Sequence, residues 1–481
     1  MNRETGGNAG PAGPLVMKFG GTSVAEADKL RRVAQLVDAG RECGVLVVLS
    51  ALAGVTDALL GAGRKAAAGD GAAALADLDA IIERHRTVAA DLCGPGVPAS
   101  IERDLAAAVA ELGDLLRGAS LLGEMPARSL DVLAGRGELL SSAILADFTG
   151  ATFVDARTVL RTDSRFGQAR PCRDATRRLA QERLVPLLGP GAVVVTQGFI
   201  GADEAGVPTT LGRGGSDYSA SLLGAAVDAR EIQIWTDVAG VLTCDPGIVK
   251  AARPVPVLGY DEAAELAAFG AKVLHPATIL PAIERGIPVT VRNSLSPEGS
   301  FTTISREAAS GLPVTAIASR GPVTVVTVRT PRMLGGTGFL ARIFEVFSRH
   351  GVSVDLVATS EVGVSATVDG AVDLSALSSE LEAFAELRIE RGRAVIALVG
   401  ESLRRTRGVP ARALTALRDT NVEMISMGSN EINLSLVVEA AEAREAMIRL
   451  HAAFFENGGA AGDDGDPADA NAVAANGGGM R

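Results

Sequence analysis

Short apolar runs alternate with longer helical stretches over the first 300 residues, and this alternation limits the fold more than any other feature of the sequence. Four of these runs are VLVVLS (45–50), AVVVTQGFI (192–200), EIQIWTD (231–237) and PVTVRN (288–293). Short runs of this kind, separated by helices, are typical of buried strands in a mostly parallel sheet. The sequence therefore predicts one α/β domain over residues 15–305, with a helical region at 64–134 inside it.

The rest of the chain contains a repeat with an offset of 70 residues. With that shift, VVTVRT (325–330) falls on VIALVG (395–400), and SEVGVSATVD (360–369) falls on NEINLSLVVE (430–439). Each copy has the order strand, helix, strand, strand, helix. This order predicts two copies of a small α+β module, and modules of this size often bind ligands between copies or between subunits.

We place the first module at 315–390 and the second at 391–456, with a strand near 314–319 as a candidate to complete the second. The two ends of the chain differ from the rest. Residues 1–14 are rich in Gly and Pro, and residues 457–481 are mostly Gly, Ala and Asp. Such segments have too few large apolar side chains to form a core, so we expect disorder at both ends.

The composition favours a globular protein and argues against several other classes. The 481 residues are 47% hydrophobic and carry a formal net charge of −11, so the chain can bury a large core. An acidic balance without a Lys/Arg block argues against binding to nucleic acid or to a membrane surface. The N-terminus has no hydrophobic signal core, and the four cysteines form no CxxC pair. We therefore expect a cytoplasmic protein.

A glycine turn, KFGGTS, follows the first apolar run and precedes a helical stretch. Its two glycines let backbone N–H groups approach an anion, and the helix N-terminus adds a dipole that favours phosphate. Lys18 is one of only five lysines among 46 basic residues, which hints that arginine cannot replace it. An ordinary turn with a surface lysine is the alternative. The chain has no Walker A motif, which excludes a P-loop kinase.

Two further stretches carry charged side chains next to predicted helices. In TTLGRGGSDYSA, Arg213 offers a planar fork for a carboxylate, and two glycines allow close backbone approach. The alternative is a helix N-cap made by Ser216 or Asp217. In GRGELLS, we expect Glu138 in the first turn of an apolar helix, where an acid is also favoured by the helix dipole alone.

Seven motifs, taken together and in order, resemble the aspartate kinases of the amino-acid-kinase family. They are KFGGTS, SALAGVT, GRGELLS, QGFIG, TTLGRGGSDYSA, WTDVAGVLTCDP and FGAKVLHP. The likeness runs from about Val16 to Phe455. The modules resemble ACT domains, and MLGGTGFLARIFEVF and VSVDLVATSEV are similar to the effector site of lysine-responsive forms. The resemblance implies an amino-acid-kinase fold, a mostly parallel sheet between helix layers, followed by two ferredoxin-like ACT modules.

The resemblance also implies a reaction, in which ATP with Mg²⁺ phosphorylates the β-carboxylate of L-aspartate to give 4-phospho-L-aspartate. This is the first step toward lysine, threonine and methionine. A carboxylate with a pKa of about 3.9 is already ionised at neutral pH, so no base has to remove a proton. The chemistry then consists of aligning two anions and neutralising their charge. Lysine is the implied inhibitor, and threonine, alone or together with lysine, remains open.

Residue roles follow from the same resemblance. Lys18 would span the transferring phosphoryl group, and Asp217 would orient Lys18. Other implied ATP-binding residues are Gly20, Gly21, Thr22, Ser23, Thr236, Asp237, Leu242, Lys272 and Val273. Arg213 would bind the α-carboxylate of aspartate and Glu138 its ammonium group, in a pocket completed by Ser50, Thr56, Phe199 and Ser216. The implied effector residues are Met333, Gly338, Phe339, Leu340, Asp355, Ser360 and Glu361. No residue is implied as a dedicated metal ligand.

Two other functions remain open from the sequence. The first is a non-catalytic amino-acid sensor on the same fold, and the second is a kinase that acts on another acyl carboxylate. Four residues argue against the sensor, because a sensor does not need phosphate-binding geometry: Lys18, Glu138, Arg213 and Asp217. Glu138 opposite Arg213 favours an α-amino acid as the substrate. We also expect a homodimer, or a higher even homo-oligomer, formed through the ACT modules.

Overall fold

The computed structural model describes residues 13–94, 96–270, 276–306, 312–334, 336–428 and 431–456. Two of the predicted site residues, Lys272 and Val273, lie outside the described residues. The predicted disordered ends also fall there, apart from the short segment 13–14. In that segment, Pro14 accepts a hydrogen bond of 3.0 Å from the N–H of Arg230.

An eight-stranded sheet forms the centre of the N-terminal domain, in the order β3-β4-β2-β1-β7-β9-β10-β8. Its strands are β1 (Leu15–Phe19), β2 (Val45–Leu49), β3 (Thr152–Phe153), β4 (Val193–Gln197), β7 (Glu231–Thr236), β8 (Val257–Gly259), β9 (Val289–Asn293) and β10 (Thr302–Ser305). Every neighbouring pair is parallel except β9 and β10. The prediction of a mostly parallel sheet is confirmed.

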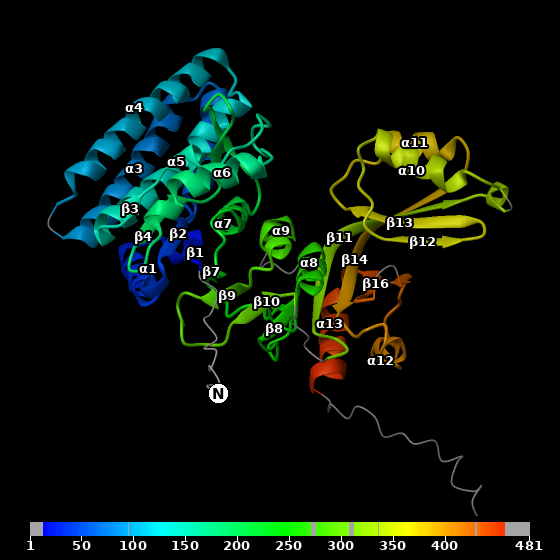
Figure 1. Cartoon of the computed structure of the whole chain (residues 1–481). Helices are drawn as coiled ribbons and strands as arrows, with labels where there is room; N and C mark the ends of the chain where they lie inside the picture. The colour runs from blue at the N-terminus through cyan, green and yellow to red at the C-terminus, as the bar shows by residue number, and fades with distance from the viewer. Residues whose placement is uncertain are drawn as a thin grey trace, which may run out of the picture.

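Helices cover both faces of this sheet, as Figure 1 shows. One layer contains α1 (Ala27–Ala39), α2 (Val55–Ala67), α3 (Gly71–Cys93), α4 (Ala99–Leu122) and α5 (Ala127–Thr149). The other contains α6 (Arg173–Arg183), α7 (Gly215–Ala226), α8 (Tyr260–Ala268) and α9 (Pro276–Arg285). Leu15 and Met17 pack in the first layer and Val16 in the second, because successive strand residues point to opposite faces. All five residues of β1 are therefore buried.

Smaller elements complete the domain. A two-stranded antiparallel hairpin, β5 (Ile200–Ala202) and β6 (Pro208–Thr210), follows β4. Short 3-10 turns are formed by Gly21–Ser23, Arg41–Cys43, Ala156–Thr158, Val185–Leu187 and, in the C-terminal part, Pro331–Met333. No helix in the described part of the chain is both long and apolar enough to cross a membrane.

The repeated part forms a six-stranded antiparallel sheet in the order β12-β13-β11-β14-β16-β15. Its strands are β11 (Ala316–Arg329), β12 (Val357–Ser360), β13 (Gly363–Asp369), β14 (Glu386–Val399), β15 (Met424–Met427) and β16 (Asn433–Glu439). Its helices are α10 (Phe339–Arg349), α11 (Ser375–Glu382), α12 (Val409–Ala416) and α13 (Ala443–His451), and a π-helical turn, Ala452–Glu456, follows α13. Both copies follow the predicted element order.

The long strands β11 and β14 each serve both modules. Residues 316–320 of β11 pair with 395–399 of β14, whereas residues 323–329 pair with 386–393. Each module thus has four strands in the spatial order 2-3-1-4, which is ferredoxin-like, and the fold class is confirmed. The predicted domain boundaries at residues 305, 315 and 390 stay predictions, because the two long strands belong to both modules.

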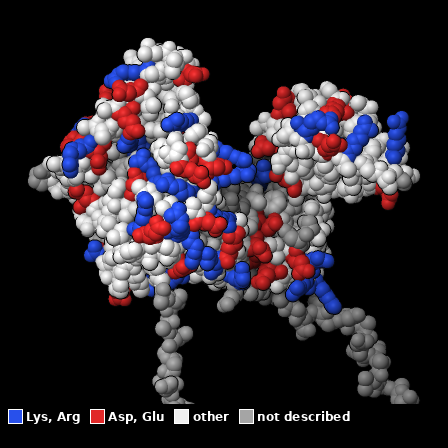
Figure 2. All heavy atoms as spheres, turned by 45° about the horizontal axis from the view of Figure 1, so that its top comes forward, with Lys and Arg blue, Asp and Glu red and all other residues white. Residues whose placement is uncertain are grey.

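The second module lies against the N-terminal domain, beside α8 (Figure 1). Thr315 Oγ1 donates to Glu262 Oε1 at 2.7 Å, and Asn433 Nδ2 donates to Glu265 Oε2 at 2.6 Å. Figure 2 shows basic and acidic side chains interspersed over one face of the molecule. The hydrogen bonds of Glu262 and Glu265 fix the second module at the carboxyl-end side of the sheet, close to the loop that follows β7.

Candidate active site

A cavity of about 240 Å³ lies where the carboxyl ends of β1, β2 and β4 meet the start of α7. Loops after neighbouring parallel strands leave the sheet at the same edge, which is where open α/β sheets bind ligands. The cavity is lined by Lys18, Gly20, Gly21, Ser50, Thr56, Glu138, Phe199, Gly212, Gly214, Gly215, Ser216 and Asp217. Nine of these residues are ones that the sequence analysis placed in the site.

The glycine turn after β1 lies close to the neighbouring strands. Gly20 N–H donates to Trp235 O at 3.1 Å, at the end of β7. A Cβ atom at Gly21 would lie 3.0 Å from Ala51 O, so a larger residue would push the turn away from the loop after β2. Glycine at this position therefore allows the two loops to pack closely around the cavity without a shift of the backbone.

Lys18 and Asp217 form an ion pair at one side of this cavity. Lys18 Nζ lies 2.6 Å from Asp217 Oδ1, and the Lys18 residue is only 7% exposed. The angle of the contact lies outside the range of a hydrogen bond, so the attraction is mainly ionic. Asp217 thereby fixes the position of the Lys18 ammonium group at the carboxyl end of β1.

Asp217 is available for this pair because it does not cap α7. The alternative of an N-cap at Ser216 or Asp217 is wrong, since α7 begins at Gly215 with Gly214 as its N-cap and without a side-chain capping bond. Gly214 has a φ of 72°, which favours glycine. The acid instead lies in the first turn of α7, where the helix dipole stabilises its charge.

Glu138 is a buried carboxylate in the middle of α5, and the expectation that it lies in the first helical turn is wrong. The helix begins at Ala127, directly after Pro126, so Glu138 is several turns from its N-terminus. Burial raises the pKa of Glu138 to about 7, against the effect of hydrogen bonds from the Ala51 N–H and the Thr56 hydroxyl. In the described structure its Oε2 atom has no hydrogen-bond partner. A buried, unpartnered carboxylate oxygen at a cavity wall is suited to bind a cation.

Phe199 is held in an unusual backbone conformation beside the cavity. Its φ is 69°, a left-handed value that is uncommon for a bulky residue. Its N–H donates to Ser219 Oγ and its carbonyl accepts from Leu211 N–H, both at 2.9 Å. A Cβ atom at Gly215 would lie 2.6 Å from the Phe199 ring. The surrounding contacts therefore impose this strained conformation, as is common at functional sites.

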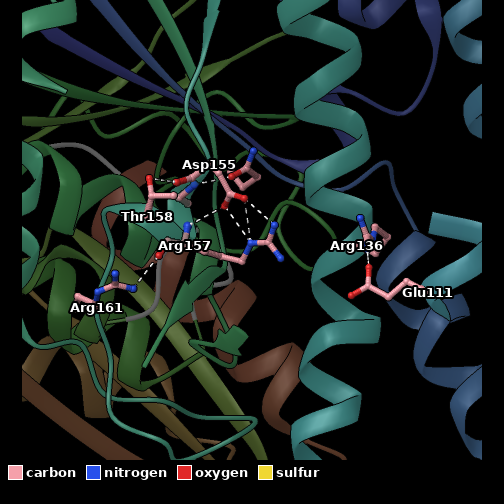
Figure 3. Close-up of polar contacts among 8 residues, drawn as sticks. Glu111, Arg136, Asp155, Arg157, Thr158 and Arg161 are labelled. Carbon is pink, nitrogen blue, oxygen red and sulfur yellow. Dashed lines mark hydrogen bonds and ion pairs between the residues drawn. The ribbon is translucent and has the colours of Figure 1, made fainter. Parts of the chain in front are cut away.

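Figure 3 shows Arg136 of α5 paired with Glu111 of α4, and near them a second group of contacts around Asp155 and Arg157. Arg136 is about 200° around the helix from Glu138 and forms an ion pair with Glu111 of α4. Beside it, Arg157 Nη2 lies 2.6 Å from Asp155 Oδ2. Burial, and then the charge of Arg157, lower the pKa of Arg136. The ion pair between Arg136 and Glu111 joins α5, the helix that carries Glu138, to α4.

The chain matches the sequence model of the amino acid kinase family over residues 13–293 and that of an ACT domain over residues 396–454. It is 39% identical over 456 residues to lysine-sensitive aspartokinase 3 of Escherichia coli (strain K12), a match that covers 92% of this chain and 99% of that protein. The chain belongs to the aspartokinases of the amino acid kinase family. Aspartokinase 1, chloroplastic, of Arabidopsis thaliana is also 39% identical, over 92% of this aspartokinase and 80% of the plant protein.

Solved structures show the same relationship. The crystal structure of E. coli aspartokinase III in complex with aspartate and ADP (R-state) has a TM-score of 0.79 and 38% identity, covering 92% of this aspartokinase and 100% of that chain. The complex of the same enzyme with lysine and aspartate (T-state) has a TM-score of 0.70, with 92% and 99% covered. In overall shape, this aspartokinase is more similar to the R-state structure.

The nucleotide residues implied by the resemblance lie in three places. Thr236 ends β7 and Asp237 follows it, and Thr236 Oγ1 donates to Asp237 Oδ1 at 3.2 Å. Thr22 is exposed, whereas Ser23 is buried. Leu242 lines a separate cavity of about 230 Å³ at the seam with the second module, together with Val238, Cys244, Ile317 and Met447.

Ser294, which the sequence analysis missed, connects two of these places. Its hydroxyl donates to Thr236 O at 3.1 Å and lies 2.8 Å from Ser23 Oγ, so the Ser23 hydroxyl donates to Ser294. The available signal was its position directly after β9, at the carboxyl edge of the sheet. The Ser23 hydroxyl proton therefore points toward Ser294, and Ser23 acts on the turn through this bond.

Arg213 and the effector residues are distributed differently. Arg213 is exposed at the rim of the cavity, between Gly212 and Gly214, and among the described residues no carboxylate lies within 4 Å of its guanidinium. The connection from β11 to α10 contains Met333 and Gly338, and α10 begins with Phe339 and Leu340. This connection lies near Ser360 and Glu361 because Thr330 N–H donates to Val362 O at 2.9 Å. Asp355 lies at the other end of the β12–β13 pair, where it forms a 2.9 Å ion pair with Arg320. One chain therefore does not bring Asp355 and Glu361 together.

Proposed function

We propose that this aspartokinase transfers the γ-phosphoryl group of ATP to the β-carboxylate of L-aspartate. The observation that carries the proposal is the unpartnered, buried oxygen of Glu138 in the same cavity as the Lys18–Asp217 pair. A cavity with a fixed cation for phosphate and a buried anion for an ammonium group matches both reactants. The crystal structure of E. coli aspartokinase III in complex with aspartate and ADP supports the same pair of ligands.

In this proposal, the two ends of the amino acid bind to opposite charges. Glu138 binds the ammonium group, and Arg213 at the rim binds the α-carboxylate through its planar fork. The pocket is completed by Ser50, Thr56, Phe199 and Ser216. In this orientation, the β-carboxylate of the bound aspartate points toward Lys18. Because that carboxylate is already ionised at neutral pH, the site needs alignment and charge neutralisation rather than a general base.

The nucleotide would lie along the turn after β1 and the end of β7. Lys18 is the buried cation available to the transferring phosphoryl group, and Gly21 offers a backbone N–H group, whereas the N–H of Gly20 is bonded to Trp235 O. Among the described residues, no group of three His, Cys, Asp or Glu side chains could hold a metal ion. Mg²⁺ in kinase sites uses one or two carboxylates together with substrate phosphates. Asp217 and Asp237 are the carboxylates available, and bound Mg²⁺ would supply further charge neutralisation.

The test is ADP release by the purified chain with Mg-ATP, with and without L-aspartate. We expect turnover that requires L-aspartate, disappears with EDTA, and is not supported by glutamate or acetate. Folded protein without aspartate-dependent turnover would contradict the proposal and favour a non-catalytic amino-acid sensor. Faster turnover with another carboxylate would instead identify a kinase of the same fold with a different substrate.

We further propose that lysine inhibits this reaction through the ACT modules and that the chain forms a homodimer or a higher even homo-oligomer. The lysine-sensitive E. coli relative and the match to an ACT domain support lysine as the effector. Because one chain does not bring Asp355 and Glu361 together, a site that uses both needs a second copy. Inhibition then reflects a coupling free energy between two sites, typically about 1 to 3 kcal/mol.

Replacing Asp355 by alanine should weaken lysine inhibition about tenfold, because a carboxylate for the effector's ammonium group is lost. The activity without lysine should stay the same, since Asp355 lies far from the cavity in the fold. The measurement is the lysine concentration that halves ADP release, repeated with threonine. Asp369→Ala is the matched control, because Asp369 also faces Arg320, at 3.6 Å, but is not a predicted effector residue. Equal effects of both substitutions would contradict the assignment of Asp355.

A further inference from the structure

Asp131 is a second buried carboxylate on α5, two helical turns before Glu138 and on the same face. It is only 3% exposed. Its Oδ1 and Oδ2 atoms accept from Gly167 N–H at 2.9 and 3.0 Å, and they also accept from the hydroxyl and the N–H of Thr210 at 2.9 and 2.8 Å. Burial raises the pKa of Asp131, and these three donors act against that effect. A buried carboxylate that is bonded so completely fixes the backbone of its donors.

These donors belong to the two segments that support Arg213. Thr210 ends β6, and Arg213 follows three residues later. Gly167 belongs to the loop before α6, and a Cβ atom at Gly212 would lie 3.1 Å from Gly167 O. Ala169 N–H also donates to Thr210 O at 2.9 Å. The loop before α6 and the end of β6 are thus held together by hydrogen bonds. Together they fix the backbone that leads to Arg213.

Arg213 itself depends on this support. It lies between Gly212 and Gly214, which have φ values of 75° and 72°, so the backbone on both sides is intrinsically permissive. Its side chain is exposed. A long side chain on a permissive backbone loses much conformational freedom when it binds a ligand, unless the backbone is already fixed.

We propose that Asp131 is a positioning residue for Arg213. By holding Thr210 and Gly167 together, it fixes the backbone from which the guanidinium reaches the substrate's α-carboxylate. The inference rests on the proposed function, because it assigns Arg213 to that carboxylate. Asp131 does not touch the substrate, and its effect is passed on through the end of β6.

A purely structural role would give a different result, and the hairpin contains a matched control. Asp203 lies at the far end of the β5–β6 hairpin and is 6% exposed. Its carboxylate accepts from Val207 N–H at 2.8 Å and from Ser164 Oγ at 3.0 Å. Asp203→Asn therefore weakens the same hairpin at a distance from Arg213. If Asp131 only stabilised the hairpin, both substitutions would act alike on catalysis.

The experiment measures kcat, KM for L-aspartate and KM for ATP in the full chain. We expect Asp131→Asn to raise KM for L-aspartate at least about tenfold, as small displacements of a binding group do. KM for ATP should change less than about twofold, and Asp203→Asn should leave KM for L-aspartate unchanged. The preference for L-aspartate over β-alanine, which lacks the α-carboxylate, should fall in Asp131→Asn. Thr210→Val, which removes only one hydroxyl, should give a smaller change in the same direction and serves if Asp131→Asn does not fold.

A double-mutant cycle tests whether the effect passes through Arg213. In an Arg213→Ala background, Asp131→Asn should cause no further loss in kcat/KM for L-aspartate. Losses that multiply would overturn the inference, and so would an equal rise in KM for ATP or an equal effect of Asp203→Asn. Absence of aspartate-dependent turnover in the unchanged chain would overturn the proposed function itself, which separates the two failures.

Discussion

Replacement of Lys18 by methionine is expected to lower kcat by about a thousandfold or more, because a fixed cation in a water-poor site stabilises the charge that moves with the phosphoryl group. Methionine keeps an unbranched apolar stem of similar length but has no charge. Lys18 is almost fully buried, and its Nζ is held 2.6 Å from Asp217 Oδ1, so no reorganisation is needed during transfer. The measurement is ADP release at saturating L-aspartate and Mg-ATP.

Two controls separate the loss of chemistry from the loss of folding. Lys65→Met removes a lysine whose ion pair with Asp77 is also 2.6 Å long but lies at the surface, and it should leave kcat unchanged. Lys18→Met also leaves Asp217 without its partner, which lowers stability. The double variant Lys18→Met/Asp217→Asn should therefore recover thermal stability without recovering activity. A fall in kcat of less than about tenfold would contradict the proposed role, since charge-stabilising groups of this kind contribute more.

Two parts of the fold could be predicted from local sequence patterns: the buried strands and the repeated modules. The apolar runs before KFGGTS and at 45–50 are buried strands, because strands covered on both faces contain few polar residues. The 70-residue offset recurs in the structure, with α10 beginning at Phe339 and α12 at Val409. The sharing of β11 between the modules was suggested only as a strand near 314–319, since pairing between distant segments leaves little local signal.

The site was predictable to the extent that single side chains are distinctive. Lys18 was identified by its glycine turn and Arg213 by its position in a glycine loop, whereas Ser294 and Asp131 act only through hydrogen bonds between segments distant in sequence. Such residues have no local pattern, because a serine after a strand or an acid in a helix is common. Glu138 was placed in a first helical turn because the proline before Ala127 was not used as a helix start signal.

Replacement of Glu138 by glutamine should affect substrate binding and stability in opposite directions. KM for L-aspartate should rise about a hundredfold or more, because removing one partner of a buried ion pair costs about 3 to 5 kcal/mol. KM for ATP should change little. At pH 8, the variant should unfold at a higher temperature than the unchanged chain without substrate, because burial of the Glu138 charge destabilises the folded state.

The pH dependence follows from the pKa of about 7 that burial gives Glu138, against a usual value of 4.5. The folded state then binds the proton more tightly than the unfolded state, so its stability falls as pH rises from 4.5 to 7. Above pH 7 the loss of stability caused by the buried Glu138 charge amounts to about 3 kcal/mol. Glu138→Gln recovers this loss, reduced by the cost of burying the amide of glutamine. The stability gain of Glu138→Gln should therefore be largest above pH 7 and disappear below about pH 4.5.

Glu262→Gln provides the contrast that makes this result specific. Glu262 is also buried, at 1% exposure, but it accepts bonds from Gly259 N–H, Thr315 Oγ1 and Glu401 N–H at 2.9, 2.7 and 3.0 Å. An amide cannot accept all of these bonds, so Glu262→Gln should lower stability. In the unchanged chain, kcat/KM for L-aspartate should fall about tenfold per pH unit below pH 7, as Glu138 becomes protonated. A flat profile between pH 5.5 and 7, or a Glu138→Gln variant with unchanged KM, would remove Glu138 from the substrate site.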